Sequence, residues 1–149
     1  MEIRKVIGIV FSLVSLITFS ILIARTEFSI QLQAWTSFNY YMRFAPYLIS
    51  IMLLYSGVYV VKKNPKSNFA MVIFGYTIVE LVALDWIGIV PNNLGTITII
   101  LFGCCAVVAL WTAHANSFSL KRLSFREVLL SILFGALESA MLYYLNSID

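Results

Sequence analysis

The chain has 149 residues, of which 61% are hydrophobic and only 11% are charged, with a formal net charge of +3. An ordinary soluble domain carries roughly a quarter of charged residues, so this chain has too few to cover a surface that faces water. The composition excludes a soluble globular domain and points to an integral membrane protein, with the lipid bilayer as its surroundings.

Five apolar runs follow one another along the chain. The shortest has 18 residues, which at about 1.5 Å of rise each covers roughly 27 Å, close to the hydrocarbon thickness of a bilayer. The expected fold is an all-α bundle of five transmembrane helices in one domain, residues 1–149, or four such helices plus one at the membrane interface. The runs are Val6 to Ala24, Phe44 to Val61, Phe69 to Val90, Leu94 to Ala115 and Val128 to Leu145.

The first apolar run resembles a secretory signal in one respect, because Arg4 and Lys5 precede it. Its 19 residues are more than the core of a usual signal, and bulky Leu22 stands where a cleavage pattern ending at Ala24 needs a small residue. We therefore expect this run to be retained as the first membrane span.

A 19-residue segment, Arg25 to Arg43, joins the first two runs. Within it, Phe28 to Ala34 alternates apolar and polar residues in the manner of a strand. An isolated strand has no partner here, so we expect a connector on the outer interface, anchored by Trp35, Tyr40 and Tyr41 as aromatic belt residues. A lid over a site, or a contact to an external partner, are the alternatives.

The basic residues predict the orientation of the chain. If all five runs cross the membrane and the N-terminus is cytoplasmic, eight of the ten Lys and Arg residues lie inside and only Arg25 and Arg43 lie outside. This positive-inside bias predicts a multi-pass protein of the cell membrane, an inner membrane in bacteria, with a cytoplasmic N-terminus. The eight are Arg4, Lys5, Lys62, Lys63, Lys66, Lys121, Arg122 and Arg126.

The last run carries small residues at every fourth position, Ser131, Gly135 and Ser139. This stripe lies on one face of a helix and is typical of close helix packing in membranes. No Lys or Arg falls between Val128 and Leu145, whereas a helix on the membrane surface needs a broad basic face. We therefore favour five spans, and expect the stripe, together with Ser56 and Gly57, to support a homo-oligomer or contact partner subunits.

Acidic residues inside the spans are the most informative feature. Three of the seven acids, Glu80, Asp85 and Glu138, fall within apolar runs, whereas none of the ten Lys and Arg residues does. A charged acid at mid-bilayer costs on the order of 3 kcal/mol on insertion scales. Each of these carboxyls must therefore be neutralised, hydrated or paired.

Position along the helix separates the three acids. Glu80 is twelfth of 22 residues in its run and Glu138 eleventh of 18, so both are expected near the midplane, where they can face one another. Asp85 lies about 7.5 Å further along the helix axis and roughly 140° around it from Glu80. We expect Asp85, next to Trp86, to mark the outer interface.

Two interpretations of Glu80 and Glu138 remain open. The carboxyls can form a proton or cation pathway in an oligomeric, non-enzymatic helix bundle, or they can be hydrogen-bonded packing groups. In the second case the protein would be a membrane anchor or sensing subunit of a larger respiratory, secretion or phage-defence assembly.

Other chemical groups give weak signals. Cys104 and Cys105 are adjacent on a helix, which suits neither an unstrained disulfide nor a Cys-x-x-Cys redox motif, so we expect buried apolar thiols. His114, the single histidine, is expected at the membrane interface rather than as a ligand. The sequence has no familiar hydrolase or phosphate-binding motif, and its basic loops suit topology and anionic lipid better than nucleic acid. We expect neither metal, cofactor nor catalytic residues.

Overall fold

A computed structural model describes residues 2–25, 37–88 and 94–148, with the side chains of 38–43, 142 and 145–148 outside the description. These ranges form five α-helices and contain no strand, which confirms the all-α class for the described part of the chain. Four helices, α1 to α4, are long and apolar enough to cross a membrane. The helices are α1 (Ile3–Arg25), α2 (Phe38–Val61), α3 (Ser67–Trp86), α4 (Thr96–His114) and α5 (Phe125–Ile148).

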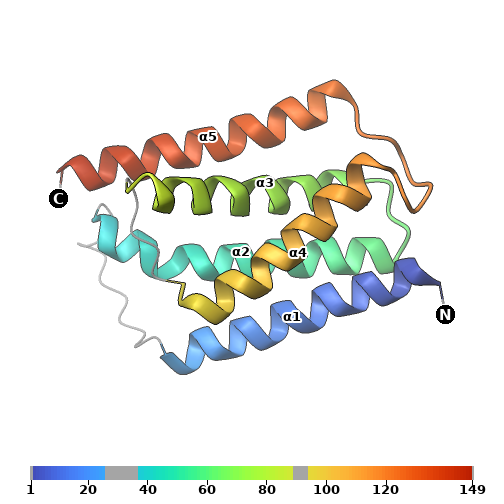
Figure 1. Cartoon of the computed structure of the whole chain (residues 1–149), viewed down its shortest axis with the longest axis horizontal. Coiled ribbons are helices and arrows are strands. Elements are labelled where there is room, and N and C mark those ends of the chain that lie inside the picture. The colour runs from blue at the N-terminus through green and yellow to red at the C-terminus, as the bar shows by residue number, and fades with distance from the viewer. Residues whose placement is uncertain (1, 26–36, 89–93, 149) are drawn as a thin grey trace.

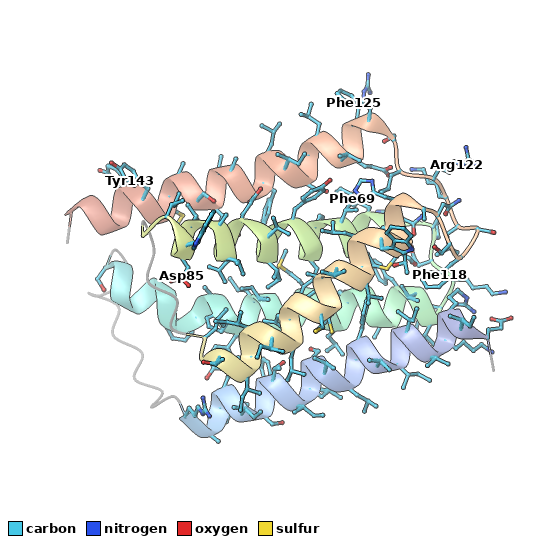
Figure 2. The ribbon with its side chains drawn as sticks, viewed as in Figure 1. Phe69, Asp85, Phe118, Arg122, Phe125 and Tyr143 are labelled. Atoms are coloured by element: carbon cyan, nitrogen blue, oxygen red, sulfur yellow. The ribbon has the colours of Figure 1, made fainter. Side chains whose placement is uncertain are left out.

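The five helices run back and forth along one bundle, and the two chain termini lie at opposite ends (Figure 1). Helix α3 contacts α2, α4 and α5, while α1 contacts chiefly α2. The N-terminus, the α2–α3 connection and the α4–α5 connection share one end, and these segments carry the eight basic residues expected inside. Figure 2 shows Arg122 near this end, and Asp85 and Tyr143 near the other.

The helix bounds differ from the apolar runs by up to six residues, as α2, α3 and α5 illustrate. Helix α2 begins six residues before Phe44, and α5 extends three residues beyond its run at each end. Helix α3 ends at Trp86 instead of Val90, because Gly88 has φ +74, in the left-handed region that glycine tolerates. The expected outer connector, Arg25 to Arg43, falls largely outside the described residues.

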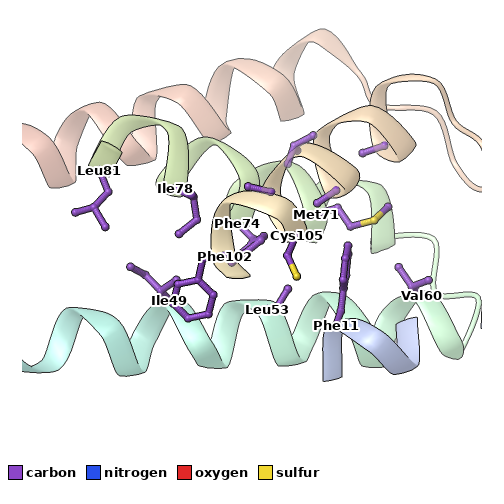
Figure 3. Packing of buried hydrophobic residues seen from close by; sticks show 14 of the residues in the cluster. Phe11, Ile49, Leu53, Val60, Met71, Phe74, Ile78, Leu81, Phe102 and Cys105 are labelled. Carbon is purple, nitrogen blue, oxygen red and sulfur yellow. The ribbon is translucent and has the colours of Figure 1, made fainter. Parts of the chain in front are cut away.

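The core of the bundle is a row of buried apolar side chains between α2, α3 and α4 (Figure 3). Phe74 and Phe102 meet edge to face, with ring centroids 6.1 Å apart. Such a geometry is favourable for aromatic rings, and it joins α3 to α4. The row includes Ile49, Leu53, Val60, Met71, Phe74, Ile78, Leu81, Phe102 and Cys105.

Helices α1 and α2 touch through their backbones at two glycines. A Cβ added to Gly57 would lie 2.6 Å from the carbonyl oxygen of Gly8, and one added to Gly8 would lie 2.8 Å from that of Gly57. Nearby, the Ser15 hydroxyl donates a hydrogen bond to the Ser50 carbonyl across 2.5 Å. Gly57 and its fully buried neighbour Ser56 therefore serve a contact inside the chain, and do not form an outer face for an oligomer.

The Arg4 side chain caps the C-terminal end of α2. The position of Arg4 before the first apolar run of the sequence does not predict this role. Its guanidinium donates hydrogen bonds to the carbonyls of Val60 and Val61, and forms an ion pair of 2.9 Å with Glu2. The last carbonyls of a helix have no partner within it and carry partial negative charge. Arg4, only 7% exposed, thus compensates them and fastens the start of α1 to α2.

Helix α5 begins with a capping box. The Ser124 hydroxyl accepts a hydrogen bond from the Glu127 N–H at 3.2 Å, and the Ser124 N–H donates to the Glu127 carboxylate at 2.8 Å. These reciprocal bonds satisfy two backbone donors at the helix start. The hydrogen bond from the Ser124 backbone, followed by that from Lys121, holds the pKa of Glu127 below its ordinary value.

Replacing Ser124 by alanine is expected to lower the stability of the α5 start by about 1 kcal/mol. Because the pKa of Glu127 is lowered on folding, the contribution of its carboxylate is complete above the unfolded pKa and disappears as the pH falls through the folded pKa. The backbone N–H that donates to this carboxylate remains in Ser124→Ala, so thermal unfolding in micelles should show a deficit at neutral pH of which only the part due to the bond between the Ser124 hydroxyl and the carboxylate disappears in acid. Ser20→Ala, which removes an exposed hydroxyl bonded to Leu16, is the control; an equal deficit in both variants would contradict the capping role.

Candidate functional site

Glu80 of α3 and Glu138 of α5 line the same small cavity. Its volume is about 10 Å³, which gives room for about one water molecule. The two acids that the sequence singles out at mid-run are thus brought together by the fold. The other lining residues are Ala45 and Ile49 of α2, Thr77, Leu81 and Leu84 of α3, and Gly135 and Ser139 of α5.

Gly135 provides the space in which the Glu80 carboxyl lies. A Cβ built on Gly135 would overlap the carboxyl atoms of Glu80, so any larger residue must displace that group. Ser131 is 2% exposed, and Ser139 lines the cavity. The small-residue stripe of α5 therefore lies at the contact with α3, inside the chain.

The Glu80 carboxyl has an unusual polar environment. Its Oε2 atom is buried and has no hydrogen-bond partner among the described residues. The cavity wall offers the hydroxyl-bearing residues Thr77 and Ser139 and the second acid, Glu138, and none of the described residues that line it is a Lys, Arg or His. An isolated carboxylate in such surroundings carries a large desolvation cost, so the site demands a proton or a cation.

Glu138 also borders a larger, apolar groove between α2 and α5. This groove has a volume of about 390 Å³, and it shares two wall residues, Ile49 and Glu138, with the small cavity. No sequence pattern predicts it, because it depends on how far α5 lies from α2. The groove is lined by Leu48, Ile49, Ile51, Met52, Phe134, Leu137, Glu138 and Met141.

Asp85 does not line either cavity and is exposed in the last turn of α3, near the bundle end opposite Arg122 (Figure 2). This placement agrees with the separation from Glu80 that helix geometry predicts. Because α3 ends at Trp86, Glu80 lies six residues from its end. The site is therefore nearer this end of α3 than the midpoint expected from the apolar run.

The cysteines and the histidine lie away from the acid cavity. Both thiols are free, but only Cys105 is buried; Cys104 is exposed, which corrects the expectation of two buried thiols. Neighbouring helical residues point about 100° apart, so one of the two faces outward. His114 Nε2 lies 3.0 Å from the Tyr76 hydroxyl. Among the described residues, no group of three or more His, Cys, Asp or Glu could hold a metal ion.

No protein-family model, curated protein or solved structure matches this chain. The functional assignment therefore rests on the chemistry of the site. Two carboxyls and two hydroxyl-bearing residues around a space for one water can bind and exchange a proton, since each group accepts or donates a hydrogen bond.

Proposed function

We propose that this protein transports protons across a cell membrane, with Glu80 and Glu138 as its central proton-binding site. The observation that carries the proposal is that acids from two helices share one cavity, with no basic side chain among the described residues of its wall. An intramembrane acid facing a bundle interior commonly marks an ion path.

The size of the cavity favours a proton over a metal cation. About 10 Å³ admits about one water molecule, whereas oxygen-bound metal ions in proteins take six or more ligands. A proton neutralises a carboxyl by forming one O–H bond and needs no shell of further ligands. We propose that the hydroxyls of Thr77 and Ser139, which line the same cavity, pass it on through a water molecule.

The proposed topology has five membrane crossings, with the basic end of the bundle in the cytoplasm. Helix α5 has 24 residues, about 36 Å at 1.5 Å per residue, and it lies beside α3 along the bundle (Figure 1). Placing α5 flat on the membrane would separate Gly135 from Glu80 and expose a carboxyl cavity to lipid. The shared site thus supports a fifth crossing.

Apolar residues of α2 form one wall of the cavity, and Glu138 is partly exposed at the groove between α2 and α5. Ala45 and Ile49 of α2 form this wall. Helix α5 contacts α3 much more extensively than α2, which makes the α2–α5 side the weaker contact. We propose that α5 moves relative to α2 and brings Glu138 into contact with water.

Proton flux into liposomes tests this function. A membrane potential set by potassium and valinomycin drives protons past the purified protein, and an internal dye records the pH. We expect wild-type flux above protein-free liposomes, and a loss of at least about tenfold in Glu80→Gln and in Glu138→Gln. Asp85→Asn, which removes an acid outside the cavity, should retain the flux; unchanged flux in both glutamine variants would contradict the proposal.

A second candidate, a membrane anchor or sensing subunit, is favoured by the outer face of α5. Large apolar side chains outside the groove are exposed there, such as Leu130 at 57% and Leu133 at 53%, so this face could contact another subunit or a second copy. In that case wild-type flux would equal the background, and the glutamine variants would lose a co-purifying partner or the oligomer. The same preparations, examined by light scattering, decide between the two functions.

A further inference from the structure

We propose that the groove between α2 and α5 binds an amphiphilic organic cation, whose charged group lies at Glu138. This inference extends the proposed function by naming a second ligand class for the same acid pair. It starts from the fact that Glu138 borders both the small acid cavity and the apolar groove.

The groove has the size and lining of a small-molecule site. Its volume, about 390 Å³, falls within the range of about 300–1,000 Å³ that ligand pockets occupy. Met52 and Met141 supply flexible, polarizable side chains that adapt to different shapes. Phe134 adds an aromatic ring, which can attract a cation through its face.

Charge complementarity selects the occupant. Of the eight described residues that line the groove, seven are apolar and Glu138 is ionisable. A lipid acyl chain forms no favourable interaction with a carboxyl group, and the Glu138 carboxylate would repel an anionic ligand. A molecule with an apolar body and one positive charge satisfies both parts of the wall, because its charge replaces the proton that otherwise neutralises Glu138.

Binding is an exchange in which charge balances. The neutral carboxyl of Glu138 releases its proton to water, and the resulting carboxylate pairs with the incoming organic cation. No bond other than the O–H bond breaks, and no electron is transferred. The organic cation and the proton compete for the Glu138 carboxyl, so each must leave before the other binds. The affinity for the cation should therefore increase as the pH rises.

Tetraphenylphosphonium is a suitable probe, since its permanent charge does not change with pH. We expect saturable binding to the purified full chain in micelles by equilibrium dialysis, with a dissociation constant that falls as the pH rises, by up to about tenfold per unit. Proton release on binding, measured in weakly buffered solution, should accompany it. A neutral molecule of similar shape should bind at least about tenfold more weakly.

Two variants locate the probe. Glu138→Gln removes the counter-charge, and Ile51→Trp fills the groove from α2; each should weaken binding at least about tenfold while the protein still elutes as a folded species. Asp85→Asn and Ile97→Trp, which alter an acid and an exposed isoleucine outside the groove, are the matched controls. Binding that survives either groove variant, or that is equal for the neutral molecule, would overturn the inference.

The outcomes of the two proposals are distinguishable. If wild-type liposomes carry no proton flux but the probe binds with the expected dependence on Glu138 and Ile51, the transport function fails and the cation site stands. If the flux depends on Glu80 and Glu138 but the probe does not bind, the cation site is wrong and the proton function stands.

Discussion

Replacing Gly135 by alanine is expected to destabilise the protein by about 1 kcal/mol, the lower end of the range for overfilled contacts, because the Glu80 carboxyl that the added methyl group meets ends a flexible side chain. The added methyl group would occupy the place of the Glu80 carboxyl, so either the carboxyl moves or α5 moves away from α3. A displaced Glu80 carboxyl would contact the apolar wall of the cavity. A displaced α5 would lose the contact that its small-residue stripe makes with α3. The loss should appear as a lower midpoint of thermal unfolding in micelles.

A second substitution identifies the clash. Glu80→Ala empties the space that the carboxyl occupies, so Gly135→Ala should lower the free energy of unfolding only slightly in that background. The double-mutant cycle should therefore give a coupling energy of about 1 kcal/mol or more. Gly103→Ala is the matched control, because a Cβ at Gly103 meets nothing within 4 Å. Equal losses for Gly135→Ala with and without the Glu80 carboxyl would show that the two residues are not in contact.

Gly57→Ala is expected to cause a loss of about 2–3 kcal/mol, near the upper end of the range for overpacked sites. Its Cβ would meet the Ser12 Oγ at 2.5 Å and the Gly8 carbonyl oxygen at 2.6 Å. A backbone atom cannot rotate away as a flexible side chain can, so α1 and α2 must separate. Their separation also strains the contact between Ser15 and the Ser50 carbonyl.

Thermal unfolding of Gly57→Ala, Gly8→Ala and the double variant measures this contact. One added methyl group already separates α1 from α2. In the double variant, the second methyl group should therefore lower the unfolding midpoint by less than it does as a single substitution. Gly103→Ala again supplies the reference for an alanine added without a neighbour. Midpoints equal to that of Gly103→Ala would mean that the two helices do not meet at these glycines.

The sequence predicts the helices well because each apolar run is long enough to cross a bilayer, and hydrocarbon requires helices or closed barrels. It predicts their ends less well. Gly88 lies within an apolar run, yet its positive φ ends α3 early. At α5 the Ser124-x-x-Glu127 pattern is a capping signal that composition alone overlooks, although it marks the true start of the helix.

The acid pair was predictable, but its surroundings were not. Glu80 and Glu138 stand near the middle of their runs without an internal base, which is sufficient to suggest that they meet. The stripe around Gly135 shows which face of α5 is packed, but small residues serve contacts within a chain and between chains alike. The groove depends on the spacing of α2 and α5, helices separated by more than sixty residues of sequence.

Infrared spectroscopy of the carboxyl groups tests the central claim, a proton held by Glu80 and Glu138, most directly. At neutral pH, in a detergent without ester groups, the wild type should show a protonated carboxyl C=O band that shifts in D₂O. The band should vanish in the Glu80→Gln/Glu138→Gln double variant and persist in Asp85→Asn. A wild type without this band, or a band that survives the double variant, would contradict the claim.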